Sequence, residues 1–226
     1  MGLDNGSVIG RSAAAELEDL LRERIFDGSL PPGQRLTATQ LAEDFGLSRG
    51  PVRTALARLE VVGLVEELGQ RGGRVTQMTP EDIKNVYAVR LNLESLAIDE
   101  MQSLSAPQLE PIRLAMASYE LARTGSSDGA VVREADLQLH RSWVVASQNS
   151  PLVAAWDLLS DRIRLAISTV NRLDVNRVSG IVKVHEDVVH AIEKSEWDEA
   201  RAALARHLNS SRDALMDSMT RTRQSQ

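Results

Sequence analysis

A tight turn between two short helical patterns is the feature that most constrains the fold. The residues Phe-Gly-Leu at 45–47 separate a helix predicted at 37–44 from a second helix predicted at 48–62. Ser48 suits the position before the second helix, because its side chain can accept a backbone hydrogen bond there. Pro51 is compatible with the first turn of that helix, which needs no backbone donor. Two short helices joined in this way predict a helix-turn-helix.

A further helix and a hairpin flank the helix-turn-helix. A helix is predicted at 12–27 from apolar residues at helical spacing, and the prolines and glycines of 28–36 end it. After Gly63, the sequences LVEEL and GRVTQM are typical of two short strands, and the glycine-rich residues 69–73 join them. One helix, a helix-turn-helix and a hairpin together predict a winged helix.

From Thr79 onward the sequence predicts helices and no strands. The predicted fold class is therefore mainly α, with an N-terminal winged helix-turn-helix followed by an all-helical antiparallel bundle. Helices are expected at about 80–102, 106–124, 128–147, 151–171, 174–194 and 196–220. Three regions follow from this pattern, namely a flexible tail at 1–11, a winged-helix domain at 12–78 and a helical domain at 79–226.

The composition excludes several classes of protein. At 226 residues, with 42% hydrophobic and 26% charged residues, the chain can bury two modest cores and is not expected to be disordered. It has no cysteine, which excludes disulfides and thiolate metal sites. No apolar run approaches the roughly 18–20 residues of a membrane span, and the N-terminus shows no secretion signal. We therefore expect a cytoplasmic protein.

The placement of arginine, rather than net charge, points to DNA. The net charge is −6, and residues 1–79 contain nine arginines, no lysine and eleven acids, a net of −2. Arg49 and Arg53 lie near the start of the second helix of the helix-turn-helix, the end that faces base edges in the major groove. Arg35, together with Thr37 or Thr39, is a candidate for phosphate contacts. Each arginine by itself is better explained as a solvated surface residue, but the ordered set of turn, cap, arginines and wing favours DNA binding.

Three of the four histidines fall on apolar helical stripes. His140 follows Asp136 by four residues, so the two side chains share one face of a helix. His185 and His207 lie on apolar stripes of two later predicted helices, whereas His190 has charged neighbours and is expected to face solvent. A buried carboxylate is costly unless it is paired or metal-bound, and one Asp with three imidazoles can coordinate zinc, nickel, manganese or iron. Each histidine alone is better explained as a core residue bonded to a backbone carbonyl, but the four groups together favour a metal site.

Arg90 is the main candidate for contact with a small-molecule effector. It lies on the inner stripe of the helix predicted at 80–102, and an arginine facing a pocket can anchor a carboxylate. Glu94 lies four residues later, so a structural Arg90–Glu94 ion pair is an equal alternative. Asn149 and Arg164 are secondary candidates for the same pocket, and Asn149 could instead cap a helix.

The N-terminal region resembles a known family of regulators. The sequence IFDGSLPPGQRLTATQLAEDFGLSRGPVRTALARLEVVGLV closely resembles the N-terminal domain of GntR-family bacterial transcription regulators, with the landmarks G-x-L-x-P-G, S-R-x-P-V-R and A-L-x-R-L-E-x-x-G-L. Gly50 and Thr54 depart from the pattern, in which threonine and glutamate are usual, and this bears on the operator sequence more than on the fold. The resemblance implies DNA contacts from Arg35, Ser48, Arg49, Pro51, Arg53 and the wing around Gly72.

Three later segments look like the helical effector-binding and oligomerisation domain of the FadR-type subfamily. They are VYAVRLNLESLAIDEM, EADLQLHRSWVVASQNSPL and VHEDVVHAIEKSEWDEARAALARHL. Leu139 and Val184 depart from the family pattern, where phenylalanine and glutamate are usual, and Val184 bears on the contacts that orient His185. In many members a D-x-x-x-H pair and two later histidines bind a divalent metal beneath a small-acid pocket. The resemblance implies this metal-binding role for Asp136, His140, His185 and His207, and it supports effector contacts from Arg90, Asn149 and Arg164.

These observations together predict a transcription regulator, not an enzyme. A homodimer on a pseudo-palindromic DNA operator is expected, since one recognition helix covers only a few base pairs. A small carboxylate effector would bind Arg90 and a divalent metal, with zinc as the first choice and nickel, manganese or iron as alternatives. Two rival interpretations stay open. One is a metal-dependent hydrolase, although no H-E-x-x-H arrangement is present, and the other is a regulator with a purely structural metal.

Overall fold

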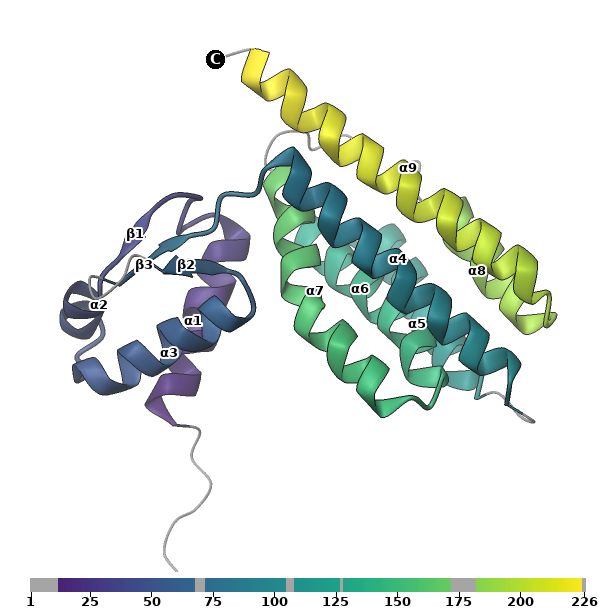
Figure 1. Ribbon diagram of the computed structural model, residues 1–226, viewed down its shortest axis with the longest axis horizontal. Helices are drawn as coiled ribbons and strands as arrows, with labels where there is room; N and C mark the ends of the chain where they lie inside the picture. Colours follow the sequence, from purple (N-terminus) through teal and green to yellow (C-terminus); the bar gives the residue numbers. More distant parts are fainter. Residues whose placement is uncertain (1–11, 68–71, 105–107, 127, 172–181, 225–226) are drawn as a thin grey trace, which may run out of the picture. The chain divides into compact units, whose positions relative to one another are not determined.

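The computed structural model divides the chain into two compact units, Met1–Gln77 and Met78–Gln226 (Figure 1). The fold is mainly α, as predicted, with a small antiparallel sheet in the first unit. The structure describes residues 12–67, 72–104, 108–126, 128–171 and 182–224. The tail predicted at 1–11 lies outside these ranges, and so do residues 174–181 of a predicted helix.

The first unit is a winged helix-turn-helix. Strand β3 lies between β1 and β2 and pairs with both in antiparallel fashion. The predicted helices and hairpin strands of this unit are confirmed, although both strands are shorter than expected. In chain order the elements are α1 (Ala13–Asp27), β1 (Arg35–Leu36), α2 (Ala38–Asp44), α3 (Arg49–Val61), β2 (Val65–Glu67) and β3 (Gly73–Val75).

Strand β1 was not predicted from the sequence, in which the prolines and glycines of 28–36 indicate only an irregular connection. Arg35 pairs with Arg74, and Leu36 pairs with Gly73, both on β3. A strand of two residues has no alternating pattern that a sequence could show. Its formation depends on pairing with β3 and on the burial of Leu36, both of which are tertiary effects.

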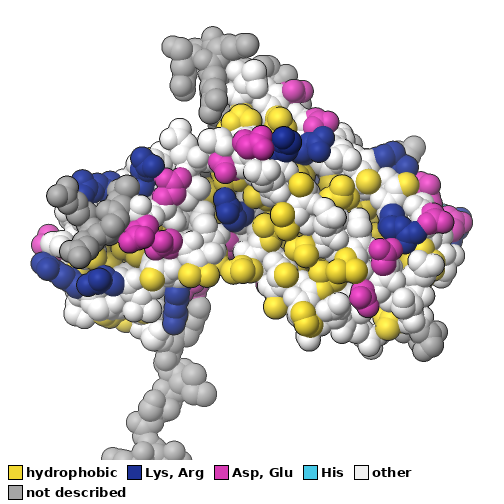
Figure 2. All heavy atoms as spheres, in the orientation of Figure 1, with side chains coloured by type: hydrophobic (Ala, Val, Ile, Leu, Met, Phe, Trp, Pro, Cys, Tyr) yellow, Lys and Arg dark blue, Asp and Glu magenta, His cyan; other side chains and the backbone are white. Residues whose placement is uncertain are grey.

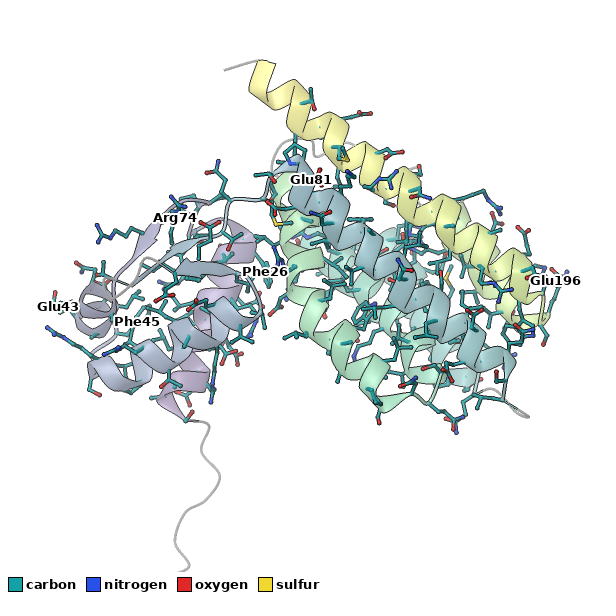
Figure 3. The ribbon with its side chains drawn as sticks, viewed as in Figure 1. Phe26, Glu43, Phe45, Arg74, Glu81 and Glu196 are labelled. Atoms are coloured by element: carbon teal, nitrogen blue, oxygen red, sulfur yellow. The ribbon has the colours of Figure 1, made fainter. Side chains whose placement is uncertain are left out.

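The apolar faces of α1 and α3 form the core of the first unit and leave one face of α3 in solvent. Leu21, Ile25, Val52 and Leu59 are fully buried between these helices and their neighbours. At the turn before α3, the guanidinium of Arg24 on α1 lies over the ring of Phe45, 5.3 Å from its centroid (Figure 3). These contacts fix the position of the turn, and therefore of the first residues of α3.

The second unit consists of helices within the described residues. The predicted helices are present, but α5 begins at Glu110 rather than at about 106, and α9 continues past 220. The expected start of α5 included residues 105–107, which lie outside the described ranges. In chain order the helices are α4 (Pro80–Gln102), α5 (Glu110–Gly125), α6 (Gly129–Ala146), α7 (Ser150–Asn171), α8 (Val182–Glu193) and α9 (Trp197–Gln224).

Side chains at the helix starts account for several boundaries. Thr79 and Asp82 form both halves of a capping box at the start of α4, where Pro80 occupies the first position. At α2, Thr37 accepts a hydrogen bond from the backbone of Gln40, whose side chain donates to Asp44 instead of returning to Thr37. Ser48 precedes α3, but its side chain forms no cap hydrogen bond.

Helix α4 is central to the second unit and packs against α6, α7 and α9. Its buried face is apolar except for Arg90 and Glu94, which are both enclosed by the neighbouring helices. Trp143 on α6 and Trp156 on α7 are almost fully buried beside them. The bundle therefore surrounds a small charged centre with aromatic side chains. Among the described residues, no helix is both long and apolar enough to cross a membrane.

Candidate nucleic-acid interface and metal centre

The first unit presents arginine at the start of α3, beside the wing. Arg49 and Arg53 are exposed, and with Thr39 of α2 and Gly72 of the wing they line a hollow of about 260 Å³. In Figure 2, dark blue side chains gather over the part of this unit that carries α2 and α3. Glu60 also lines the hollow, further along α3. The structure thus brings the predicted base-reading arginines to the same surface as the wing.

The other predicted DNA contacts differ in their exposure and in the bonds that they already form. Arg35 and Ser48 are exposed, and Pro51 is half-buried in the first turn of α3. The oxygen of Thr37 already caps α2, but its hydroxyl proton can still be donated to a phosphate. Arg74, on strand β3 beside the wing, forms a 2.7 Å ion pair with Glu66 (Figure 3).

Gly72 has a structural reason to be glycine. Its φ angle is +106°, in a region that residues with a side chain rarely adopt. A Cβ atom at this position would lie 2.2 Å from the carbonyl oxygen of Leu36 on β1. The wing therefore approaches β1 more closely than any side chain at position 72 would allow.

The four predicted metal ligands converge inside the second unit. Asp136 and His140 come from α6, His185 from α8 and His207 from α9, and one ligand atom from each lies within 4.8 Å of all the others. The His140 and His185 Nε2 atoms are 3.1 Å apart, and the His140 and His207 Nε2 atoms are 3.2 Å apart. The Asp136 Oδ1 atom is 3.0 Å from His185 Nε2. The three imidazoles are buried, and Asp136 is half-buried.

This donor set fits a divalent cation. Tetrahedral zinc with bonds of about 2.0–2.1 Å to nitrogen places neighbouring ligand atoms about 3.3 Å apart, close to the shortest separations found here. Burial lowers the pKa of His140 and of His207, so both imidazoles are neutral at neutral pH, the form that binds metals. Burial acts to raise the pKa of Asp136, but the hydrogen bond with His185 and electrostatic attraction to His140, His185 and Arg90 outweigh it and lower that pKa. Asp136 is therefore an ionised carboxylate.

Glu94 also belongs to this site, although its place in the sequence indicates only an ion pair with Arg90. Its Oε1 atom accepts hydrogen bonds from Arg90 Nε at 2.7 Å and from Trp156 Nε1 at 3.4 Å. Its Oε2 atom accepts from His140 Nδ1 at 2.7 Å and from Trp143 Nε1 at 2.9 Å. Burial acts to raise the pKa of Glu94, but attraction to His140 and Arg90 and their hydrogen bonds lower it to about 2. The sequence carries one signal for this role, because Glu94 lies on the otherwise apolar stripe of the helix predicted at 80–102.

Arg90 shows features of both roles weighed for it. Its Nε atom forms the ion pair with Glu94, as the structural alternative requires. Its Nη2 atom is buried and has no hydrogen-bond partner among the described residues, so one arm of the guanidinium can still accept a ligand. The Arg90 guanidinium carbon also lies 5.5 Å from the centroid of the Tyr87 ring. Arg90 is thus paired with Glu94 through Nε, and its Nη2 atom has no hydrogen-bond partner within the described ranges.

The two secondary effector candidates have structural partners. Asn149 Oδ1 accepts a hydrogen bond from the backbone nitrogen of Leu152, so Asn149 caps α7. Arg164 lies 3.6 Å from Glu134 across α6 and α7 and is only partly exposed. His190 is exposed, as its charged neighbours predict.

Comparisons with known proteins identify the families that the two units resemble. The model of the family "Bacterial regulatory proteins, gntR family" matches residues 13–75, and that of the FCD domain matches residues 85–210. The HTH-type transcriptional regulator YdhC of Bacillus subtilis is 28% identical over 195 residues, which cover 84% of each chain. A protein of Paenarthrobacter nicotinovorans named "Probable D-xylose utilization operon transcriptional repressor" is also 28% identical, covering 87% of this chain and 86% of its own. Among solved structures, Escherichia coli McbR/YncC has a TM-score of 0.74 at 19% identity, covering 93% of this chain and all of its own, 100%.

Proposed function

Because this chain belongs to the gntR family of bacterial regulatory proteins and carries an FCD domain, we propose that it is a transcription regulator whose affinity for its operator is controlled by a small carboxylate bound at a divalent metal site. Its relatives are regulators of transcription and not enzymes, which removes the hydrolase interpretation. The observation that carries the proposal is the convergence of Asp136, His140, His185 and His207 in the second unit of a DNA-binding chain.

The proposed base contacts come from the first turns of α3. Arg49 and Arg53 are exposed on one surface with the wing, and a bidentate arginine–guanine contact is worth about 1–3 kcal/mol of discrimination between bases. Arg35, Thr37, Ser48, Pro51 and Gly72 would position the DNA backbone.

Substitution of Arg49 tests this assignment. Arg49→Ala is expected to weaken operator binding about 5–100-fold and to relax base preference, as measured by gel-shift titration against randomised operators. Arg58→Ala is a matched control, because Arg58 lies on the same helix but is paired with Glu18 of α1. Full affinity and full selectivity in Arg49→Ala would show that α3 is not the recognition helix.

A homodimer is the proposed binding unit, because one recognition helix reads only a few base pairs. Exposed apolar side chains on α4 and α7, which include Val89, Leu96 and Leu158, offer a surface for a second copy of the chain. Figure 2 shows yellow side chains gathered over these two helices. Light scattering at several concentrations tests the dimer, with Leu158→Glu expected to weaken it. A pseudo-palindromic operator should lose most of its affinity when one half is scrambled.

The proposed effector site joins the metal ligands to Arg90. A bound divalent cation, zinc as first choice or nickel, manganese or iron, would offer a Lewis-acid centre for one carboxylate oxygen. The free Nη2 of Arg90 would hold the carboxylate by a charge-assisted hydrogen bond. Asn149 and Arg164 remain proposed contacts, although both side chains have structural partners in this structure.

Native mass spectrometry of protein purified without a histidine tag or chelator tests the metal and the effector together. One metal and one small organic mass per subunit are the expected result. Protein that remains empty after incubation with divalent metals would remove the metal proposal. A bound carboxylate alters DNA binding only to the extent that it binds one arrangement of the dimer better than the other. Gel shifts with and without the identified carboxylate measure that difference.

Burial of three histidines at the ligand cluster also favours a second candidate, a regulator whose metal is purely structural. Structural metal sites contribute directly to folding. This alternative predicts a large loss of thermal stability on chelation and no carboxylate that changes operator affinity. The proposed sensor predicts that such a carboxylate exists and that Arg90→Gln loses the response to it.

A further inference from the structure

Glu94 connects Arg90 to a metal ligand through the two oxygens of one buried carboxylate. Arg90 Nε binds one oxygen at 2.7 Å, and His140 Nδ1 binds the other at 2.7 Å. Two tryptophan Nε1 atoms, from Trp143 and Trp156, complete the set of donors. The donors come from α4, α6 and α7, and the carboxylate has no exposure to solvent. Such complete satisfaction of a buried anion points to a specific role rather than to chance packing.

The carboxylate determines which nitrogen of His140 carries its proton. An ionised carboxylate can only accept hydrogen bonds, so Nδ1 of His140 must be the protonated nitrogen. The lone pair of His140 therefore lies on Nε2. This is the atom 3.1 Å from His185 Nε2 and 3.2 Å from His207 Nε2, at the centre of the ligand cluster.

The His140 ring is also prevented from turning over. The edge of the imidazole meets Trp143, with ring centroids 4.5 Å apart and an interplanar angle of 70°. Trp143 Nε1 in turn donates to the same oxygen of Glu94 that His140 contacts. A flipped imidazole would lose the Glu94 hydrogen bond and would direct the Cε1 carbon instead of Nε2 toward the other ligands.

A second imidazole of the cluster lacks this support. His185 Nδ1 is buried and has no hydrogen-bond partner among the described residues. The His185 ring contacts Tyr119 edge-on, with centroids 4.8 Å apart, and this contact fixes no tautomer. The support that Glu94 gives His140 is therefore not a general property of the histidines in this cluster.

We propose that Glu94 is the positioning residue of the metal centre, holding His140 as the Nδ1-protonated tautomer with Nε2 aimed at Asp136, His185 and His207. Carboxylates that orient a metal-binding histidine also raise the basicity of its free nitrogen, and their loss typically costs 10–100-fold in metal affinity. The inference rests on the proposed metal site, but the tautomer of His140 is a property of the metal-free chain and is measured separately.

The experiment combines a metal titration with a tautomer measurement on the full chain. Metal-free wild type and Glu94→Gln are titrated with Co²⁺ and with Zn²⁺ in competition with a chromophoric chelator. Glu193→Gln is the matched control, because Glu193 is also paired with an arginine, Arg113 at 2.6 Å, but lies on the surface. Long-range ¹H–¹⁵N spectra then report the tautomers of the four histidines, with His140 assigned from a His140→Gln variant.

We expect Glu94→Gln to bind both ions at least 10-fold more weakly and Glu193→Gln to match wild type within 2-fold. We also expect His140 of the metal-free wild type to be protonated at Nδ1. A folded Glu94→Gln variant with wild-type affinity, or a wild-type His140 protonated at Nε2, would overturn the inference.

Failure of the metal proposal has a different signature. If wild type binds neither ion, the metal site itself is wrong, while the tautomer spectrum still decides whether Glu94 orients His140. If Glu94→Gln does not fold, the wild-type spectrum gives the same decision without any variant.

Discussion

The two units of this chain place the charged residues of their proposed sites in opposite environments. In the first unit, Arg49 and Arg53 extend from α3 into solvent, where they contribute little to stability. In the second unit, Arg90 and Glu94 are buried, each with less than 2% of its surface exposed. Loss of the partner of a buried charge is strongly destabilising, so function and stability are coupled there. Substitutions at the proposed DNA contacts of the first unit are therefore expected to cost little stability, whereas substitutions at the proposed site of the second unit are expected to destabilise it.

Removal of Arg90 gives the largest expected effect. Arg90→Ala would leave the Glu94 carboxylate without its cationic partner, and breaking a buried pair in this way typically costs about 3–5 kcal/mol. All three tryptophans lie in the second unit, so urea denaturation followed by tryptophan fluorescence reports the stability of that unit.

Arg113→Ala is the control for Arg90→Ala in the same unit. Arg113 also pairs with a glutamate, but its side chain is 51% exposed. The control is expected to cost less than about 1 kcal/mol. Equal losses from the two variants would contradict the contrast between buried and exposed charge.

The second largest expected effect is a difference between the two units in the pH dependence of their stability. The pKa values of His140 and His207 are lowered by burial, so the unfolded chain binds more protons than the folded chain below the ordinary histidine value of 6.5. The contribution of these two histidines to the free energy of unfolding of the metal-free second unit is therefore complete above about pH 7. It falls as the pH drops from 6.5 towards the pKa values that the histidines have in the folded chain. The fall is up to about 1.4 kcal/mol per histidine for each pH unit.

Calorimetry with a chelator present measures this dependence for both units. Tryptophan fluorescence identifies the transition of the second unit. The first unit contains no histidine and is expected to melt at nearly the same temperature from pH 7.5 to 5.5. A second-unit transition that is equally insensitive to pH would show that its imidazoles are not buried in neutral form.

How much the sequence predicted also differs between the units. In the first unit, local sequence signals are enough to predict the helices, because turn residues and helix-breaking residues mark the helix ends within a short segment. They do not reveal β1, which exists only through its pairing with β3. The family resemblance predicts that Gly72 lies at the DNA surface, but the sequence does not show that Leu36 excludes a side chain at that position.

In the second unit, helical spacing predicts which faces are buried and places Asp136 and His140 on one face. The convergence of His185 and His207 with that pair depends on the packing of α8 and α9, which spacing cannot show. Glu94 illustrates the same limit. Its position four residues after Arg90 is visible in the sequence, but its bonds to His140, 46 residues later, are not. The sequence indicates interactions between distant segments only through the chemistry of the four candidate ligands and through resemblance to a family.

Gly72→Ala is expected to have a smaller effect on stability. It tests whether a residue of the proposed DNA-binding surface in the first unit is also needed for folding. The alanine Cβ would meet the Leu36 carbonyl oxygen at 2.2 Å, and the φ of +106° is itself unfavourable. Strain of this kind costs on the order of 1–3 kcal/mol. Gly50→Ala is the matched control, because a Cβ at Gly50 meets nothing within 4 Å and alanine favours the helix.

Hydrogen exchange of peptides from 13–75 measures both glycine variants. Faster exchange is expected in Gly72→Ala, and equal or slower exchange in Gly50→Ala. Unchanged exchange in Gly72→Ala would mean that the wing can move away from β1 without cost to the fold.

The smallest expected effect comes from the exposed counterpart of the Arg90–Glu94 pair. Arg58 on α3 lies 3.2 Å from Glu18 on α1, but the Arg58 side chain is 50% exposed. Solvent screens this pair, so Arg58→Ala is expected to change stability by less than about 0.5 kcal/mol, as measured by hydrogen exchange in α1 and α3. The two pairs have the same chemical groups and differ in their surroundings. A loss above about 2 kcal/mol in Arg58→Ala would mean that the first unit also depends on its charges for folding, and that its DNA-binding surface is less free to vary than its exposure indicates.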